Sequence, residues 1–407
     1  MAGYRHYIRR LKHLAASPAF LGILICLCLL TALQCALRYG HSWYGNTFTA
    51  SAEPTASVED PEIDWSKLVY VQHVTSPEYL CNALMVWSQI ETIGSRAKVR
   101  DALSAIGDVM SVDHLLIWVS QRLMMYPSHW DPTEIDDLDP ERGLTHTARL
   151  LQAAEKDYYV TLHPVEVLNE NNTSQSTWAS SYSKLLSFNL TSYSRILSLD
   201  AASIVLQNLD ELFLLPKAPI AMPYTYWGGP SGWAFSSQLM LLEPSSTTFS
   251  AMETAIKDAK EDEYDVDIIN KLYKGKVLKI PQRPYNLLSG EFRRANHRAY
   301  LGSRSAKWDP DDIFAEARYL HFSDWPIPKP WMSARRELLN KYMPRCSKSE
   351  WFGATDCRDR TIWLKLYADF AATRRAVCGP GFEMHSQDLP AAPIYRHGRW
   401  FHPDDVE

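Results

Sequence analysis

Cysteine is scarce in this sequence, and positive charge is not in excess. The 407 residues include 7 cysteines, with no Cys-x-x-Cys pair and no mixed His/Cys spacing of the kind that binds zinc. The formal net charge is −5 and the isoelectric point is near 6.2, which argues against general binding of nucleic acids. We therefore expect neither a zinc module nor a nucleic-acid partner.

Charged residues are also absent from one long N-terminal run, residues 14–37. A helix of about 20 apolar residues spans the core of a bilayer, whereas the apolar core of a signal peptide is shorter, roughly 7 to 15 residues. Four basic residues precede the run and only Arg38 follows it closely, so the N-terminus is predicted to be cytoplasmic and the rest luminal. The predicted segments are a cytoplasmic tail (1–18), a transmembrane signal anchor (19–37) and a luminal stem rich in Ser, Thr and Pro (38–63). The alternative is a cleaved signal peptide.

A luminal location agrees with the remaining cysteines and with glycosylation patterns. Four cysteines follow the predicted anchor, and an oxidising compartment permits disulfides between them. Cys346 and Cys357 are the nearest pair, and the sequence leaves the pairing open. Triplets of the N-glycosylation pattern begin at Asn171, Asn172 and Asn189. The first two lie in the polar segment NENNTSQS, which we predict to be an exposed loop.

Strand-like and helix-like segments alternate from about Trp65 onward. Strands are predicted at residues 67–75, 157–167, 195–200, 218–227 and 237–244. Helices are predicted at residues 76–94, 177–190, 208–215, 247–261, 265–275 and 360–379. This alternation predicts an α/β fold with a mostly parallel central sheet. We expect one Rossmann-type domain at residues 64–345 and a Cys-containing extension at 346–407.

A single carboxylate stands at the end of one predicted strand. Asp200 follows the apolar residues 196–199, and ligands of parallel sheets bind at the carboxyl ends of the strands. A lone acid at such a position is also common as a helix cap or as an acceptor for a backbone amide. The neighbouring sequence decides between these two interpretations.

Several motifs resemble those of glycosyltransferase family eight, the glycogenin-like retaining transferases. The segment SLDAASIVLQNLDELF resembles the family's central motif, in which a strand ends in Asp-x-Asp before VLxNxDELF. Other segments look like family motifs in the expected order: YVQHVTSPEYLCNAL, TWASSYSKLLSFNLTSYSRILSLD, DVDIINKLY and HFSDWPIPKPW. This chain also resembles a fungal branch of the family, the Golgi glucose N-acetyltransferase-like proteins, in the segments SSQLMLLEP, RPYNLLSGEF and TDCRDR. The resemblance implies a GT-A-like domain that uses UDP-N-acetylglucosamine.

The resemblance implies a metal site made by two residues that are far apart in sequence. A divalent ion, usually Mn²⁺, bridges the two phosphates of a nucleotide sugar and acts as a Lewis acid while the sugar leaves. Hard oxygen ligands together with an imidazole suit such an ion. Asp200 and His321 are the protein ligands that the family motifs imply.

The same motifs imply residues that hold the UDP-sugar donor beside Asp200. Lys184 and Lys329 would supply positive charge at the leaving group or hold the sugar. Tyr79 offers an aromatic face to the uracil, and Thr75 offers a hydroxyl. The ordinary alternatives are solvated charge for Lys329 and core packing for Tyr79.

Retaining transfer needs few protein groups, because the leaving phosphate itself takes the proton of the attacking acceptor. Asp265 is the candidate for orienting the sugar or steadying oxocarbenium charge, and Asp267 is the alternative. Gln238 is a candidate for contacting the donor. The ordinary interpretation of both acids is the solvated start of a helix.

Two features depart from the family pattern. Ala202 stands where the family has the second Asp of its strand-end motif, which removes one charge and one oxygen ligand. Because ligand number and charge set metal affinity, we expect weaker metal binding, by roughly 1–3 kcal/mol. Members of the family pass directly from the first helix to the next strand, whereas residues 99–121 intervene here. This segment is either an extra helix and short strand or the product of a retained intron.

The expected function is that of a retaining glycosyltransferase in the Golgi membrane. It would transfer N-acetylglucosamine from UDP-GlcNAc to a glycan acceptor, with Mn²⁺ as cofactor and one N-terminal helix in the membrane. Transfer from UDP-glucose or UDP-galactose is one alternative. A catalytically weakened pseudo-glycosyltransferase is the other, because of Ala202.

Overall fold

A computed structural model describes most of the chain after residue 63. The described residues are 64–93, 121–136, 143–168, 181–228, 234–260, 263–332, 334–348, 355–379, 394–396 and 399–401. The chain divides into two units, Met1–Glu62 and Ile63–Glu407, and the described residues all belong to the second.

Several of the expectations fall outside the described residues. They are the cytoplasmic tail at 1–18, the membrane anchor at 19–37, the stem at 38–63, the polar loop at 169–176, and the insertion at 99–121 except for its last residue, Gln121. Within the part that the structure describes, no helix is long and apolar enough to cross a membrane.

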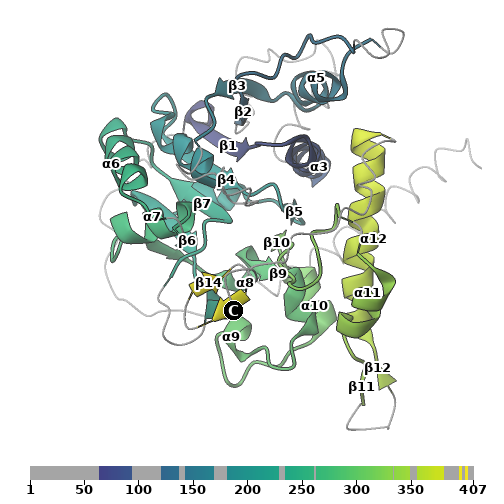
Figure 1. Cartoon of the computed structure of the whole chain (residues 1–407). Helices are drawn as coiled ribbons and strands as arrows, with labels where there is room; N and C mark the ends of the chain where they lie inside the picture. Colours follow the sequence, from purple (N-terminus) through teal and green to yellow (C-terminus); the bar gives the residue numbers. More distant parts are fainter. Residues whose placement is uncertain are drawn as a thin grey trace, which may run out of the picture. The chain divides into compact units, whose positions relative to one another are not determined.

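The central sheet has seven strands, in the order β3-β2-β1-β4-β7-β6-β8 (Figure 1). Its strands in chain order are β1 (Leu68–His73), β2 (Gln121–Pro127), β3 (Thr161–Val165), β4 (Arg195–Leu199), β6 (Ile220–Pro223), β7 (Leu239–Leu242) and β8 (Leu278–Ile280). Every neighbouring pair is parallel except the two pairs that β7 makes, with β4 and with β6. The predicted α/β fold with a mostly parallel sheet is confirmed.

Helices cover both faces of this sheet, as alternating side chains along the strands require. In β1, Leu68 and Tyr70 point into one buried cluster, and Val69 and Val71 point into the other. The first cluster packs against α3 (Pro77–Ile93), α5 (His146–Tyr158) and α12 (Arg358–Cys378). The second packs against η5 (Ser181–Asn189), α6 (Ser246–Lys257) and α7 (Asp265–Leu272).

The helix predicted at 177–190 is a 3₁₀ helix, η5, over its described part. Its run contains three serines, whose hydroxyls compete for backbone hydrogen bonds and so weaken an α-helix. The Ser183 hydroxyl accepts instead from the backbone N–H of Leu168, 15 residues earlier in the chain, at 3.0 Å. The segment nevertheless buries Lys184, one of the residues predicted to hold the donor.

A second, three-stranded sheet brings the late part of the chain to the central one. Its strands are β5 (Ser203–Val205), β9 (Leu287–Leu288) and β10 (Tyr319–His321), in the order β5-β10-β9. β5 begins three residues after Asp200, and its antiparallel pairing with β10 puts His321 opposite Ser203. Pairing of these two short strands therefore brings the predicted metal ligands together.

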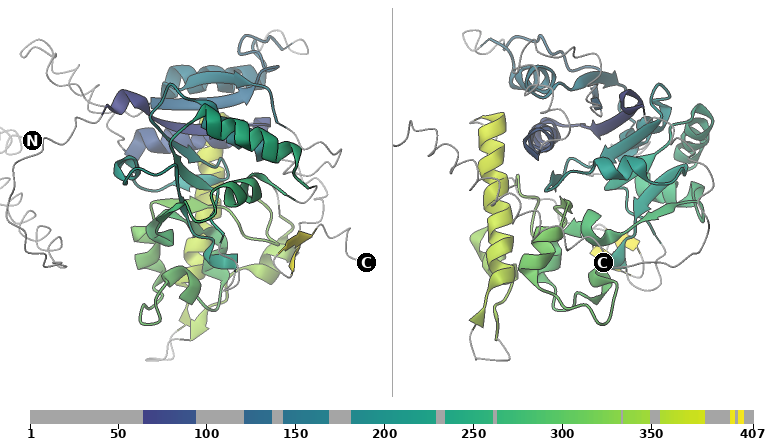
Figure 2. Two further views of the ribbon diagram at one scale, coloured as in Figure 1. Left: turned by 90° about the vertical axis from the view of Figure 1, so that its left-hand side faces the viewer. Right: turned by 180° about the vertical axis from the view of Figure 1, so that it is seen from behind.

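Helix α12 packs across α3 and belongs to the core of the domain (Figure 2). Its residues Trp363 and Phe370 are buried in the same cluster as α3. A disulfide between Cys81 and Cys378 joins the two helices across a sequence separation of 297. The extension that begins at 346 thus supplies a structural helix to the domain.

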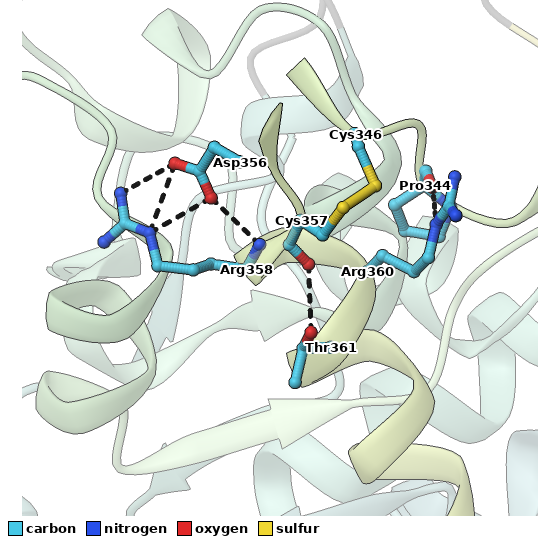
Figure 3. The surroundings of a disulfide bond; sticks show 7 residues. All are labelled: Pro344, Cys346, Asp356, Cys357, Arg358, Arg360 and Thr361. Carbon is cyan, nitrogen blue, oxygen red and sulfur yellow. Dashed lines mark hydrogen bonds and ion pairs between the residues drawn. A yellow bond between two sulfur atoms is a disulfide. The ribbon is translucent and has the colours of Figure 1, made fainter. Parts of the chain in front are cut away.

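A second disulfide stabilises the entry to α12 (Figure 3). It joins Cys346 to Cys357, the pair that is nearest in sequence, around the hairpin of β11 (Ser347–Lys348) and β12 (Thr355–Asp356). The Cys357 carbonyl accepts from the Thr361 hydroxyl at 3.1 Å in the first turn of the helix. The Arg360 guanidinium donates to the Pro344 carbonyl at 2.7 Å, which holds the preceding chain against the helix.

The remaining elements are short connections around these layers. They are η2 (Trp65–Lys67), η6 (Asp210–Leu214), η7 (Tyr226–Gly228), α8 (Gln282–Tyr285), η8 (Ser289–Arg293), α9 (Arg298–Leu301), α10 (Pro310–Glu316), α11 (Arg336–Tyr342), β13 (Ile394–Arg396) and β14 (Arg399–Phe401).

The two disulfides are expected to contribute unequally to stability. They close loops with sequence separations of 297 and 11, for which chain entropy predicts roughly 5 and roughly 3 kcal/mol. The double variants Cys81→Ala/Cys378→Ala and Cys346→Ala/Cys357→Ala should therefore differ in their free energy of unfolding, measured in urea. An equal loss in the two variants would contradict this expectation.

Candidate active site

Asp200 lies at the carboxyl end of β4 and has several partners. Its Oδ2 accepts from Lys184 Nζ at 2.9 Å, and its Oδ1 accepts from the backbone N–H of Ala202 at 2.8 Å. Burial alone would raise the pKa of Asp200, but the Lys184 ammonium and the hydrogen bonds of His321 and Ala202 hold it well below its usual range. The carboxylate is therefore ionised at neutral pH.

Lys184 connects two carboxylates in the interior of the protein. Its ammonium is 2.9 Å from Asp200 and 3.5 Å from Asp265, and it donates to the Ser237 carbonyl at 3.3 Å. The side chains of Lys184 and Asp265 are only 6 % and 7 % exposed, so water does little to solvate either charge. Burial lowers the pKa of Lys184, but the two carboxylates outweigh it and raise the pKa above its ordinary value. Lys184 is thus a fixed positive charge at the site.

His321 reaches the same carboxylate from β10. Its Nε2 is 3.5 Å from Asp200 Oδ1. Burial, with the nearby Lys329 charge, lowers the pKa of His321 to about 4, so the ring is neutral at physiological pH. Its Nδ1 is buried and has no hydrogen-bond partner among the described residues. The structure brings Asp200 and His321 together as predicted, and their role as metal ligands stays a prediction.

The backbone of Ala202 makes two hydrogen bonds at the strand end, and its methyl side chain offers no ligand atom. Its N–H donates to Asp200, and its carbonyl accepts from the Phe322 N–H at 2.8 Å. The side chain is 2 % exposed and belongs to the apolar core. The loop geometry at the strand end is therefore independent of a second carboxylate.

Lys329 approaches the site on a loop that follows β10. Its ammonium donates to the Phe322 carbonyl at 2.5 Å. Burial lowers its pKa to about 8, with Asp200 opposing the shift and Lys184 adding to it. Its role in holding the donor stays a prediction.

The loop between His321 and Lys329 is held by distant parts of the chain. Asp324, which is 7 % exposed, accepts from Trp363 Nε1 at 2.6 Å and from the Tyr367 hydroxyl at 3.0 Å, both on α12. It also pairs with Arg293. A Cβ on Gly290 would lie 2.8 Å from the Ser323 carbonyl, so only glycine permits this close approach of η8 to the loop.

Tyr79 comes from the first turn of α3, directly after β1. Its ring meets Trp331 edge-on, with centroids 5.4 Å apart, so the first and last family motifs are in contact. Burial and the Asp200 charge raise the pKa of Tyr79. Ser76 Oγ accepts from the Tyr79 N–H at 3.4 Å at the start of this helix. Thr75 lies partly buried between β1 and α3.

Asp265 and Asp267 have different surroundings at the start of α7. Asp265 is buried and pairs with Lys184. Asp267 is exposed and accepts from the Tyr264 N–H at 3.0 Å as part of a capping box. Of the two alternatives, Asp265 is therefore the acid that the structure brings to Asp200.

Gln238 lies beside Asp200 at the start of β7. Its backbone carbonyl accepts from the Asp200 N–H at 3.0 Å and from the Tyr319 hydroxyl at 2.7 Å. On α7, Asn270 exchanges two hydrogen bonds with the backbone of Phe235, which positions the segment before Gln238. The predicted donor-contacting residue thus lies next to the strand-end carboxylate.

His73, the last residue of β1, is one member of the site that sequence reasoning missed. Burial, followed by the Lys184 charge, lowers its pKa to about 4 against the opposing charges of Asp200 and Asp265. The register of β1 on β4 places His73 beside Asp200. The available indication was a polar residue near the end of a predicted strand in the same sheet as Asp200.

The described residues contain no group of three or more His, Cys, Asp or Glu side chains that could hold a metal ion. One carboxylate and one neutral imidazole, Asp200 and His321, are the donors at hand. A carboxylate has about four lone-pair directions, so Asp200 can accept from Lys184 and Ala202 and still bind a cation. This donor set fits a hard divalent ion whose other ligands come from a diphosphate or water.

Comparison with known proteins places the chain among sugar-transferring enzymes. No protein-family model matches it. It is 38 % identical over 322 residues to Glucose N-acetyltransferase 1 of Gibberella zeae, covering 78 % of this chain but 63 %, less than two thirds, of that relative. It is 36 % identical over 350 residues to the protein of the same name in Aspergillus fumigatus, covering 83 % of each. The Saccharomyces cerevisiae protein of that name is 24 % identical over 433 residues, 77 % of this chain and 82 % of that one.

Solved structures give weaker likenesses. A complex of the galactosyltransferase LgtC with donor and acceptor sugar analogs has a TM-score of 0.44 at 13 % identity, over 74 % of this chain and 96 % of that one. The apo form of mouse xyloside xylosyltransferase 1 has a TM-score of 0.37 at 14 % identity, over 64 % of this chain and 99 % of that one. The sequence relatives therefore carry the assignment of the chain to a family.

By these relatives the chain is a glycosyltransferase, and an α/β fold with its charged residues at the carboxyl edge of the sheet agrees with that class. Within the class, the chain belongs to the fungal Glucose N-acetyltransferase 1 family.

Removal of the Lys184 charge is expected to destabilise the fold. In Lys184→Met, Asp200 and Asp265 would remain charged and buried without their shared cation, a loss of about 3–5 kcal/mol. The matched control is Lys271→Met, whose partner Glu263 is 2.8 Å away but whose side chain is 55 % exposed, for a loss of under about 1 kcal/mol. Urea unfolding measures both, and equal losses would contradict the proposed importance of the buried charge.

Proposed function

We propose that this chain is a retaining glycosyltransferase that transfers N-acetylglucosamine from UDP-GlcNAc to a glycan acceptor in the Golgi lumen. The observation that carries the proposal is the approach of His321 Nε2 to within 3.5 Å of Asp200, beside the Lys184 ammonium. The names of the relatives support N-acetylglucosamine as the transferred sugar.

In this proposal the chain's cationic groups hold the donor and compensate the charge that develops on it. Lys329 and Lys184 present positive charge where the diphosphate gains negative charge, and burial strengthens that interaction. Tyr79 packs against the uracil, with Thr75 beside it. The low pKa of His321 keeps its ring available as a ligand or hydrogen-bond partner, since no proton competes for it at neutral pH.

A divalent cation such as Mn²⁺ would be held by Asp200 and His321. When bound, it supplies Lewis-acid stabilisation of the leaving diphosphate. With two protein ligands the affinity for the ion alone is low, so the ion and the nucleotide should bind together more tightly than either binds separately.

Retention follows if the acceptor attacks the face of the sugar that the nucleotide leaves. A phosphate oxygen of the departing UDP then accepts the acceptor's hydroxyl proton, and the new bond forms at the anomeric carbon as the bond to UDP breaks. Asp265 is held by Lys184 and orients the sugar or steadies positive charge at the anomeric carbon. Gln238 contacts the donor from the neighbouring strand.

Two alternatives remain. UDP-glucose or UDP-galactose is the donor if the site does not select the acetamido group. A pseudo-glycosyltransferase that binds without turnover is favoured by one observation, the buried methyl of Ala202 at the position of the family's second carboxylate. Anchoring by a single N-terminal helix, with the domain in the lumen, completes the proposal.

Turnover by the purified full chain tests the proposed function. UDP-GlcNAc, UDP-glucose and UDP-galactose are supplied with Mn²⁺ and with N-glycan, O-mannose and glycolipid acceptors, and released UDP and sugar transfer are both measured. We expect UDP-GlcNAc to be the preferred donor and a chelator to abolish transfer. His321→Ala should lower the rate at least about 100-fold, as expected for losing a group that stabilises the transition state.

The control for this experiment is His163→Ala, because His163 is an exposed histidine on β3. Donor binding without turnover, unaffected by chelator, would point to the pseudo-enzyme. Preferred use of UDP-glucose or UDP-galactose would sink the assignment of the donor sugar.

A restored carboxylate is expected to tighten metal binding. Ala202→Asp adds a charged oxygen ligand, which should strengthen Mn²⁺ binding about tenfold or more, measured by calorimetry with UDP present. Ala202→Asn has the same size without the charge and should not do so. Because Ala202 is 2 % exposed, unfolding is measured in parallel. Equal metal affinities in the two variants would show that the missing charge is not what limits this site.

A further inference from the structure

Three neighbouring strands end in one row of polar residues. β1 pairs in parallel with β4, with Val71 opposite Ser198, and the same register places His73 beside Asp200. β4 pairs with β7, and the ladder extends to the bond between the Asp200 N–H and the Gln238 carbonyl. His73 and Gln238 therefore flank Asp200 on its two sides at the edge of the sheet.

The side chains of this row share one face of the sheet. Residues two or four positions away in the same strands belong to the buried cluster that packs against η5 and α7: Val69, Val71, Ile196, Met240 and Leu242. By the alternation of a strand, His73, Asp200 and Gln238 point to the same face. η5 and α7 are also the elements that supply Lys184 and Asp265. The polar side chains of this row therefore follow the apolar side chains on the same face of the sheet.

The two flanking residues have buried polar atoms without partners. Among the described residues, nothing hydrogen-bonds His73 Nδ1 or Gln238 Oε1. Buried polar groups are rarely left in this state, because each loses its bonds to water without a replacement. At the carboxyl edge of a mostly parallel sheet, a ligand is the natural source of the missing partners.

The chemistry of His73 suits a sugar better than a diphosphate. Its ring carries two nitrogens, and Nδ1 is buried without a partner among the described residues. A neutral imidazole has one acceptor and one donor nitrogen, and the Gln238 amide likewise offers both. Hydroxyl and acetamido groups both donate and accept, so they match this pair, whereas a diphosphate only accepts and is matched by the lysines.

We propose that His73 is a binding residue for the donor sugar, where it hydrogen-bonds a hydroxyl or the acetamido group on the side of Asp200 opposite to Gln238. This inference rests on the proposed function, since it requires a UDP-sugar donor. It adds a sugar contact from β1, the strand that precedes the predicted uracil-binding residue Tyr79.

Binding of the full chain to UDP-GlcNAc and to UDP, compared by calorimetry with Mn²⁺ present, tests the proposal. His73→Leu removes the hydrogen bond and should weaken UDP-GlcNAc about tenfold while changing the affinity for UDP less than about twofold. His73→Asn keeps a polar atom at the position of Nδ1 and should recover most of the affinity. His163→Leu, in an exposed histidine of β3, is the matched control and should change neither.

A second measurement on the unmodified protein covers the case in which His73→Leu does not fold. The imidazole nitrogen resonances of ¹⁵N-histidine-labelled protein are recorded, and His73 is assigned by its absence in His73→Asn. Addition of UDP-GlcNAc should shift the His73 resonance, and addition of UDP should not.

The outcomes separate this inference from the proposed function. A wild-type protein that neither binds UDP-GlcNAc nor transfers its sugar contradicts the proposed function itself. A wild-type protein that binds UDP-GlcNAc, but whose affinity for it relative to UDP is unchanged in His73→Leu, overturns the role of His73 alone. So does a His73 resonance that UDP and UDP-GlcNAc shift equally.

Discussion

The ammonium of Lys184, buried between the carboxylates of Asp200 and Asp265, is the interaction on which the site depends. It joins η5, the end of β4 and the start of α7, which also pack against one another through apolar side chains. In a medium of low polarity an unpaired charge is costly, so each of the three groups requires the other two. The arrangement keeps Asp200 ionised and holds the acid of α7 toward the sheet edge.

Ala202 shows that the backbone geometry of the strand end and its chemistry are separable. The N–H and carbonyl of this residue still bind Asp200 and Phe322, so the turn and the approach of β10 survive without the second carboxylate. What this position lacks is a carboxylate, so a cation at the proposed site would depend on Asp200, His321 and the substrate.

The C-terminal helix shows how far local pattern alone could take the prediction. Residues 360–379 predicted a helix from composition, and α12 (Arg358–Cys378) confirms it. No local pattern indicated that its Trp363 and Tyr367 hydrogen-bond Asp324, or that Cys378 bonds Cys81. These contacts support the loop that carries Lys329, and they join segments that only the folded chain brings together.

The sequence by itself determined the fold class, the strand that ends at Asp200 and most of the residues that the structure brings to that strand end, because strand and helix periodicity is local and the motifs are contiguous. Tertiary structure decided the rest: the choice of Asp265 over Asp267, the 3₁₀ form of η5 and the inclusion of His73. The role of a polar residue at a strand end can be assigned only when the strand register and the facing helices are known. Register and burial arise from pairing across the whole domain, which no short stretch of sequence specifies.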